Sequence, residues 1–313
     1  MRFGKFRISP WVIVERLYNL LAKIWFIPFG FYARPISVTG TIPHPLAPRT
    51  LRDLLLQKMM FPDNIERAIV SDKIAARGWV ADRIGADHLI PLYGIYDTPE
   101  ELYENTHPFP YVIKTNHASG QYFFVNNQAD LDKFMTVVPK WNAGEHRPKR
   151  EWAYRGIRRK FMVEKFIKDP QRPEIVELKL MCFFGTPVMI QCIRDRGLNV
   201  KKSMMTPEWK DAKTHLVTLP SYRLPERPAE LEEALRIGRE LSADFDWIRV
   251  DLYVCAGRVY FGEMTNFTHG GDSMYQPHSV DKMMFDLYHK LRNEKIDGAR
   301  AAYQQAEIEK LSA

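Results

Sequence analysis

Residues 10–27 carry the apolar and polar spacing of an amphipathic helix with a narrow polar face. The polar positions, which fall within about 100° of each other on a helical projection, are Glu15, Arg16, Asn19 and Lys23. Charged residues inside the apolar stretch argue against a membrane span, and no small-residue cleavage site follows to suggest a signal peptide. Two interpretations stay open. The helix lies in a cytoplasmic membrane interface, helped by Trp11, Trp25 and the basic residues before it, or it packs on the body or on a second subunit.

The next segments predict a connector followed by helices and one strand. Five prolines in residues 28–50 predict an extended connector rather than a helix or a central strand. Apolar spacing over residues 51–85 predicts helices, with a helix start at Ser71-Asp72-Lys73. Residues 89–96 predict a short strand, and Thr98-Pro99 predicts the cap of a brief helix.

The centre and the C-terminal half alternate short strands with a few helices. Strands are predicted at 111–115, 121–125, 160–167, 175–184, 187–195, 247–254 and 258–263. Helices are predicted at 129–141, 228–242, 280–292 and 298–311, and residues 208–224 are predicted to be irregular. Several strands are joined by tight turns, at 116–120, 185–186 and 256–257. This order predicts an α+β protein with antiparallel sheets rather than an alternating parallel α/β fold.

Composition adds a preference for anionic partners. The chain has 313 residues, of which 45% are hydrophobic and 27% charged, so it is long enough for a substantial core and is ordinary for a globular protein. Its net charge of +7 favours a nucleotide, a nucleic acid, an acidic polymer or an anionic membrane surface. Three scattered cysteines, Cys182, Cys192 and Cys255, give neither a disulfide framework nor a zinc site, and we expect them to be buried and structural.

Several charged residues on predicted strands suit the chemistry of ATP, although no Walker, GxGxxG, GxSxG or HExxH motif is present. Lys114 ends a strand just before a small-residue turn, and Lys179 lies on a later strand. Lysines hold phosphate oxygens as mobile point charges, and backbone N–H groups of a turn can close on the β- and γ-phosphates. Asp251 and Glu263 lie at nearly equal distances from the turn of one hairpin, so cross-strand pairing can place both carboxylates on one face to hold magnesium.

This ordered set resembles the ATP-grasp fold and, more closely, its TupA-like branch, named for teichuronopeptide biosynthesis. The resemblance covers roughly residues 52–285. The segments that carry it are Ser71-Asp72-Lys73, Gly94-Ile-Tyr-Asp97, Lys114 with its turn, Glu164, Lys179, Arg194-Asp195-Arg196, Arg249-Val-Asp251 and Phe261-Gly-Glu263-Met-Thr265. It implies two α+β lobes whose antiparallel sheets grip ATP, and an N-terminal amphipathic helical extension outside them.

The resemblance also implies a set of site residues. The residues expected to bind ATP are Lys114, His117, Ser119, Gly120, Glu164, Lys165, Phe166 and Lys179. Those expected to ligate Mg²⁺ are Asp251, Glu263 and Thr265, where Thr265 stands in the place that Asn takes in many ATP-grasp enzymes. Because His117 lies in a turn, an ordinary loop role for it stays open. Arg194 and Arg196 end a strand expected to face the site, where an arginine would stabilise an acyl phosphate and a tetrahedral oxyanion.

The expected division of the chain has five parts. Residues 1–50 form the helix and connector, 51–110 an N-terminal α/β segment, 111–165 the first ATP-grasp lobe, 166–292 the second lobe with the metal-binding hairpin, and 293–313 a C-terminal helix. The basic run at 147–160 either guides an acidic substrate or is a solvated face.

The expected function is an ATP-dependent carboxylate–amine ligase that acts through an acyl phosphate. The resemblance points to an acidic glycan, such as a uronic acid, as the carboxylate in cell-surface polysaccharide synthesis, with an amine as co-substrate. The expected location is the cytoplasm or its membrane face. A phosphotransferase acting on a hydroxyl and a non-catalytic nucleotide-binding scaffold stay open as alternatives, as does a homo-oligomer. Nucleic-acid binding is disfavoured because the basic run has few stacking aromatic residues.

Overall fold

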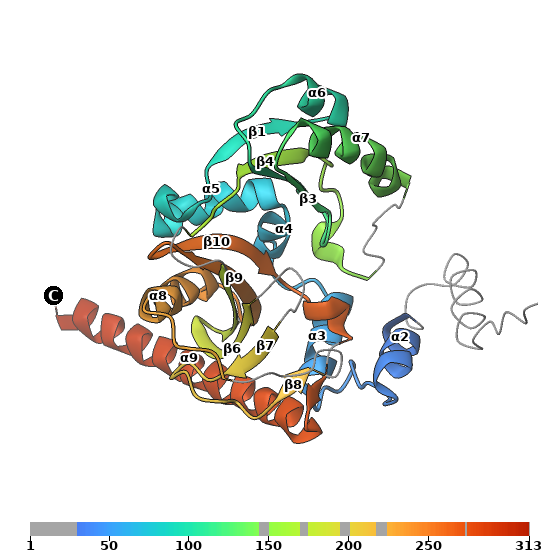
Figure 1. Ribbon diagram of the computed structural model, residues 1–313. Coiled ribbons are helices and arrows are strands. Elements are labelled where there is room, and N and C mark those ends of the chain that lie inside the picture. The colour runs from blue at the N-terminus through green and yellow to red at the C-terminus, as the bar shows by residue number, and fades with distance from the viewer. Residues whose placement is uncertain are drawn as a thin grey trace, which may run out of the picture.

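The computed structural model describes residues 30–143, 150–169, 175–194, 201–216, 224–272 and 274–312. Within them, a smaller lobe with one antiparallel sheet projects from a larger body with another (Figure 1). The smaller sheet has the strand order β1-β4-β2-β3, formed by β1 (Leu92–Tyr96), β4 (Phe161–Lys165), β2 (Tyr111–Thr115) and β3 (Tyr122–Val125). Helices α6 (Pro99–Glu104) and α7 (Gln128–Ala143) cover the face that carries Tyr111, Ile113 and Val163.

The larger sheet is five-stranded, with the order β10-β9-β5-β6-β7. Its strands are β10 (Arg258–Thr265), β9 (Ile248–Cys255), β5 (Val176–Phe183), β6 (Thr186–Arg194) and β7 (Lys201–Met205). One face packs on α8 (Leu231–Ser242) and α5 (Lys73–Ile84). The other face packs in part on α3 (Leu51–Met60) and α9 (His278–Ser312), near the small pair β8 (His215–Leu216) and β11 (Tyr275–Gln276).

The short helix α4 (Glu66–Ser71) and the start of α5 lie between the two sheets (Figure 1). Asp72 separates these helices, and its carboxylate accepts a hydrogen bond from the N–H of Ile74, which caps α5. This confirms the helix start expected at Ser71-Asp72-Lys73. The 3₁₀ turns η1 (Ala86–His88), η2 (Trp152–Tyr154) and η3 (Thr268–Gly271) complete the connections.

Three local predictions were wrong or incomplete. The connector over residues 28–50 contains a helix, α2 (Gly30–Thr39), with Pro35 inside it. Hydroxyl groups near its end return hydrogen bonds to the backbone, from Ser37 to the carbonyl of Arg34 and from Thr39 to that of Pro35, and they help to hold the turn. Helix α9 is continuous where two helices were expected, because one interior glycine, Gly298, costs only about 1 kcal/mol against alanine.

Strand β7 was missed because Lys201–Met205 shows no apolar alternation. This segment is a strand because it pairs with β6 at the edge of the sheet, where lysines are common. The cysteine prediction is confirmed, since Cys182, Cys192 and Cys255 are free and buried. Burial raises the pKa of Cys182 to about 12.

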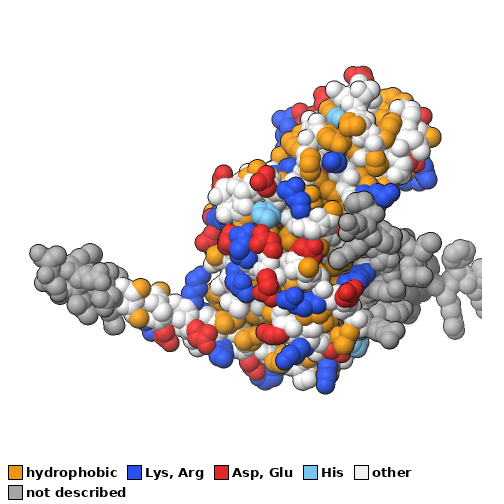
Figure 2. All heavy atoms as spheres, turned by 60° about the vertical axis from the view of Figure 1, so that its left-hand side comes forward, with side chains coloured by type: hydrophobic (Ala, Val, Ile, Leu, Met, Phe, Trp, Pro, Cys, Tyr) orange, Lys and Arg blue, Asp and Glu red, His pale blue; other side chains and the backbone are white. Residues whose placement is uncertain are grey.

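Charged side chains of both signs are mixed on the surface. On the face shown in Figure 2, basic and acidic side chains alternate over the larger body rather than forming one basic patch. The basic run is also partly engaged, because Arg150 donates to Asp272 and Lys160 pairs with Asp97. No helix within the described ranges is long and apolar enough to cross a membrane. The amphipathic segment 10–27 lies outside the described residues, so its membrane or packing role stays a prediction.

Candidate functional site

The polar side of the site lies on one face of the larger sheet. Alternation along β5 and β9 turns Leu178, Leu180 and their neighbours toward α8, and turns Lys179, Arg249 and Asp251 to the opposite face. Lys179 and Asp251 are direct cross-strand partners. Charged side chains are therefore held at fixed positions in the middle of a sheet rather than on loops.

A β-bulge brings Glu263 to the same face. Phe261 pairs with Leu252 and packs in the α8-side core, so simple alternation would also turn Glu263 toward that core. The register shifts by one residue at Gly262, after which Glu263 pairs with Asp251. A Cβ at Gly262 would lie 2.9 Å from the Asp251 carbonyl and 2.8 Å from the ring of Tyr253, so glycine is required there. The expected placement of both carboxylates on one face is confirmed, and the bulge is its cause.

Asp251 is held by two cations. Arg249 grips it in a fork, with Nε 2.6 Å from Oδ1 and Nη2 2.7 Å from Oδ2. Lys179 also binds Asp251 and lies 3.0 Å from Glu177. The Asp251 side chain is 1% exposed, whereas that of Glu263 is 30% exposed. Asp251 is thus a buried anchor, and Glu263 is the accessible carboxylate of the pair.

The charge on Glu263 is stabilised from several elements. Burial alone would raise the pKa of this carboxyl, but the charges of Lys73, Lys179, Arg249 and Lys114 lower it to about 2. Lys73 Nζ lies 3.8 Å from a Glu263 oxygen, and Arg249 Nη2 lies 3.4 Å from the other. Because Lys114 belongs to the smaller sheet and Lys179 to the larger, cationic side chains of both lobes act on one carboxylate.

The smaller sheet contributes a second charged cluster. Lys114 Nζ donates to Glu164 Oε2 at 2.6 Å, on the face of the sheet away from α7. Arg77, on α5, donates to the other oxygen of Glu164 at 2.8 Å and to the Ile90 carbonyl. The structure therefore brings Lys114 and Glu164 together, as the sequence suggested, and adds Arg77 as a fixed counter-charge.

The turn after Lys114 is anchored at its base and exposed at its tip. Buried Asn116 donates to Asp72 and to the Arg158 carbonyl, each at 3.0 Å, and accepts from the Lys160 N–H at 2.8 Å. Lys73 Nζ donates to the Ala118 carbonyl at 2.7 Å. His117 is buried, while Ser119 and Gly120 are exposed, and Gly120 has a positive φ of 77°. The exposed tip is the part of this turn that can reach a ligand.

Aromatic side chains stand beside these charges on the same face of the smaller sheet. Tyr122 and Phe124 are 44% and 49% exposed, and Phe124 packs edge-on against Phe166 with ring centroids 5.7 Å apart. Exposed aromatic rings on a sheet face are a stacking surface for a planar or ring-shaped ligand. Lys165 is exposed and points by alternation to the other face from Glu164.

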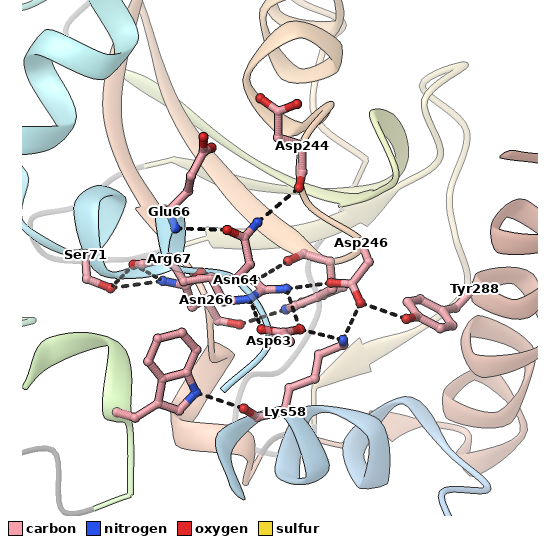
Figure 3. Close-up of polar contacts among 12 residues, drawn as sticks. Lys58, Asp63, Asn64, Glu66, Arg67, Ser71, Asp244, Asp246, Asn266 and Tyr288 are labelled. Atoms are coloured by element: carbon pink, nitrogen blue, oxygen red, sulfur yellow. Dashed lines mark hydrogen bonds and ion pairs between the residues drawn. The ribbon is translucent and has the colours of Figure 1, made fainter. Parts of the chain in front are cut away.

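Thr265 and its neighbour Asn266 have different roles. Thr265 Oγ1 accepts a hydrogen bond from Arg249 Nη2 at 2.9 Å, which places it in the charged cluster. Asn266 lies in a buried network in which its amide accepts from Arg67 and donates to the Arg67 carbonyl and to Ser71 (Figure 3). Asn266 is fully buried and its side-chain oxygen is turned to Arg67, so it does not replace the Asn that Thr265 lacks.

The buried network of Arg67 and Asn266 also connects two segments that carry site residues. Arg67 is fully buried and donates to Asp63, Asp246, Asn266 and the Trp247 carbonyl (Figure 3). Ser71 is two residues before Lys73, and Asn266 directly follows Thr265. The network therefore ties the start of α5 to the end of β10, which are the two segments that carry Lys73 and Thr265.

The structure does not bring Arg194 to this cluster. Alternation places it on the face of Ile190 and Cys192, toward α8, and its Nη2 donates to the Glu226 carbonyl at 2.7 Å. The prediction that Arg194 faces the site was wrong, since residues 191 and 193 have that orientation. Arg196 lies outside the described residues. Arg249 instead is the arginine beside Asp251 and Glu263.

Comparison with known proteins agrees with this arrangement. A family model described as TupA-like ATPgrasp matches residues 51–289. The chain belongs to the TupA-like ATP-grasp family. The resemblance seen in the sequence and the α+β fold of ATP-grasp type, with two antiparallel sheets, are thus confirmed. Curated proteins gave no match.

Solved structures match part of this chain at low identity. N5-carboxyaminoimidazole synthetase from Staphylococcus aureus is 13% identical over 63% of this chain and 44% of its own, with a TM-score of 0.38. D-alanine–D-alanine ligase from Bacillus anthracis, complexed with ATP, is 18% identical over 64% and 55%, with a TM-score of 0.37. L-amino acid ligase from Bacillus licheniformis is 13% identical over 64% and 41%, with a TM-score of 0.39. The chain spans about half the length of these structures.

The donor set fits the Mg²⁺ that the ATP-grasp fold implies. Asp251 and Glu263 are adjacent on one face, and Glu263 is both ionised and accessible. No group of three or more His, Cys, Asp and Glu side chains gathers as a metal site in the described part of the chain. Magnesium commonly takes one or two protein carboxylates and completes its shell with phosphate oxygens and water. A site of two carboxylates suits a metal that arrives with a nucleotide.

Sequence reasoning missed three charged residues of this TupA-like ATP-grasp site, namely Lys73, Arg77 and Arg249. Lys73 and Arg249 belong to two segments that carry the family resemblance, Ser71-Asp72-Lys73 and Arg249-Val-Asp251, but the resemblance assigned no role to either residue. The sequence could have identified Arg249, because residues 249 and 251 must share one face of a strand. Lys73 and Arg77 come from a helix whose position between the sheets no local pattern shows.

Proposed function

We propose that this TupA-like ATP-grasp protein is an ATP-dependent carboxylate–amine ligase that works through an acyl phosphate. The observation that carries the proposal is the convergence of Lys73, Lys114, Lys179 and Arg249 on the ionised Glu263. Such a cluster offers positive charge for a polyphosphate and a carboxylate for its counter-ion. Family membership supports an enzyme of ligase type.

ATP is proposed to bind with its phosphates between the lysines of the two sheets. Lys114 and Lys179 contact phosphate oxygens, and each exchanges a carboxylate partner for them. The turn tip at Ser119 and Gly120, with His117 at its base, closes over the phosphates through backbone N–H groups. Glu164 and Phe166 form the side toward the nucleoside, where the ring of Phe166 is available for packing. Lys165, whose side chain points to the other face of the sheet, contributes its backbone there.

The proposed magnesium ligands are Asp251 and Glu263, with Thr265 as a further oxygen. When bound, the metal supplies charge neutralisation for the phosphates and orients them. The residues around the metal supply further positive charge. Arg249 is raised in pKa overall: burial alone would lower it, but the charge and hydrogen bonds of Asp251 outweigh that effect. It stays a cation throughout the reaction.

The proposed chemistry has two steps. A substrate carboxylate oxygen attacks the γ-phosphorus, and the bond from phosphorus to the bridging oxygen breaks with its electron pair leaving on ADP. The amine nitrogen then attacks the carbonyl carbon of the acyl phosphate, loses a proton, and displaces inorganic phosphate to leave an amide. In this proposal Arg249 stabilises the oxyanion that develops at that carbon, by about 3 kcal/mol for one preorganised charged donor.

The proposed carboxylate is an acidic sugar such as a uronic acid in cell-surface polysaccharide synthesis, joined to an amine at the cytoplasmic face of the membrane. The support is the family match together with the net charge of +7, which favours acidic substrates.

The test is identification of products. Protein, ATP and Mg²⁺ are incubated with uronic-acid oligosaccharides and single amino acids, and products are measured by mass spectrometry. We expect a product lighter by one water than the sum of both substrates, together with ADP and free phosphate in equal amounts. A product that gains a phosphoryl group would instead establish a phosphotransferase.

A further inference from the structure

A small pocket lies next to Arg249 on the polar face of the larger sheet. It is enclosed by α3, the η3 turn, β11 and the start of α9, and its lining includes Arg52, Gln191, Arg249, His269, Tyr275 and Asp281. The remaining wall is largely apolar, with Leu51, Leu55, Met181 and Leu216. Arg249 belongs both to this pocket and to the charged cluster, so the pocket adjoins the place proposed for the γ-phosphate.

Arg52 presents an unused edge in this pocket. The residue is 4% exposed, and its Nη1 donates to Thr39 Oγ1 at 2.5 Å and Thr41 Oγ1 at 2.9 Å. Its Nε is buried with no hydrogen-bond acceptor, and Nη2 has none among the residues that the structure describes. Buried guanidinium nitrogens are almost always paired, so this edge of Arg52 is a donor that remains available to an acceptor.

The geometry of that edge selects the ligand. Nε and Nη2 lie on one side of the planar guanidinium and donate in parallel, as Arg249 does to the two oxygens of Asp251. The threonine contacts fix the opposite side of Arg52, so the group cannot turn to find another partner. A carboxylate is the planar anion that matches such a fork.

His269 and the acidic Asp281 also line the pocket. Burial and neighbouring cations lower the pKa of His269 to about 4, so the imidazole is neutral at neutral pH. Asp281, whose pKa is raised by burial to about 6, accepts the Arg52 backbone N–H at 3.3 Å, and its charge also acts on the Arg52 guanidinium. Arg249 uses Nε and Nη2 on protein oxygens, and Nη1 makes no hydrogen bond within the described ranges.

We propose that this pocket is the binding site for the substrate carboxylate, gripped in two points by Nε and Nη2 of Arg52 and flanked by Arg249. The apolar wall then contacts the carbon skeleton of a small carboxylic acid or of the acidic end of a larger one. The inference rests on the proposed function in taking the bound carboxylate to be the group that reacts. Helix α2 then has a role in the site, because its residue Thr39 sets the orientation of Arg52.

The test compares a dicarboxylate with its neutral diamide, using glutarate and glutaramide as probes in saturation-transfer NMR on the full chain. We expect glutarate to bind and glutaramide not to bind. Arg52→Gln should weaken glutarate binding by about tenfold or more, as loss of a charged two-point contact implies. Arg52→Lys should keep only part of the affinity. Arg49→Gln, the same change at an exposed position on the preceding loop, should bind as wild type does.

Equal glutarate binding by wild type and a folded Arg52→Gln would overturn the inference, as would no glutarate binding by wild type. If Arg52→Gln does not fold, as shown by thermal denaturation, crystals of wild type soaked in glutarate decide the matter. Density for a carboxylate on Arg52 supports the proposal, and glutarate bound only elsewhere overturns it.

Failure of this site is distinguishable from failure of the ligase proposal. If glutarate binding depends on Arg52 but no amide ever forms, the pocket stands and the ligase proposal fails. If amide forms and Arg52→Gln has an unchanged KM for the carboxylate substrate, the ligase stands and the pocket assignment fails.

Discussion

Glu263 illustrates how a single side chain depends on charges from both lobes. Its carboxyl is ionised because four cations outweigh the cost of burial, which lowers its pKa from the ordinary 4.5 to about 2. Replacement by glutamine keeps the shape but removes that charge. We expect Glu263→Gln to fold and to lose at least about a hundredfold in turnover, as removal of one preorganised charged group does.

The lowered pKa of Glu263 makes the stability of the protein depend on pH. Because the folded pKa lies below the unfolded one, Glu263 stabilises the protein above about pH 4.5. That contribution is lost as the pH falls through 4.5 toward about 2. Urea unfolding of wild type should therefore lose stability more steeply in this window than Glu263→Gln. Glu240→Gln, on the surface of α8, is the control and should follow wild type. Identical acid profiles for wild type and Glu263→Gln would contradict the assigned charge environment.

At the scale of elements, the bulge in β10 decides whether the carboxylates meet. Gly262→Ala would press a Cβ to within 2.9 Å of the Asp251 carbonyl, so β10 must move. We expect a loss of about 1–3 kcal/mol in unfolding free energy and loss of magnesium-dependent ATP binding, measured by urea unfolding and calorimetry. Gly78→Ala in α5, where a Cβ meets nothing within 4 Å, should be neutral or stabilising. ATP binding unchanged in Gly262→Ala would show that the bulge does not position the pair.

The network behind the site joins two other elements, α4 and β10. Asn266→Ala removes the amide that links Arg67 to Ser71 and leaves buried donors and acceptors unpaired. We expect destabilisation of about 1–3 kcal/mol and a raised KM for ATP, because the start of α5 is no longer fixed. Asn64→Ala, on the exposed side of the same network (Figure 3), should cost less than half as much. A larger cost at Asn64 would contradict this view of the network.

At the scale of the whole molecule, the sequence predicted what depends on short-range pattern. Alternation and turn residues located most strands, and the spacing around Ala256-Gly257 predicted that Asp251 and Glu263 lie together, although the bulge at Gly262 that achieves this was not predicted. The missed features depend on long-range packing. Arg77 reaches Glu164 only because α5 lies between the sheets. The error at Arg194 has the same origin as the success at Asp251, since one residue of phase along a strand reverses the face.

The central proposal is that this two-lobed protein joins a carboxylate to an amine through an acyl phosphate. The most direct measurement uses a carboxylate substrate labelled with oxygen-18 on both oxygens, incubated with ATP, Mg²⁺ and an amine. The released phosphate and the product are then analysed by mass spectrometry. We expect each molecule of phosphate to carry one labelled oxygen and the amide to keep the other. Unlabelled phosphate released with an amide product, or a stable phosphate ester on a hydroxyl, would contradict the proposal.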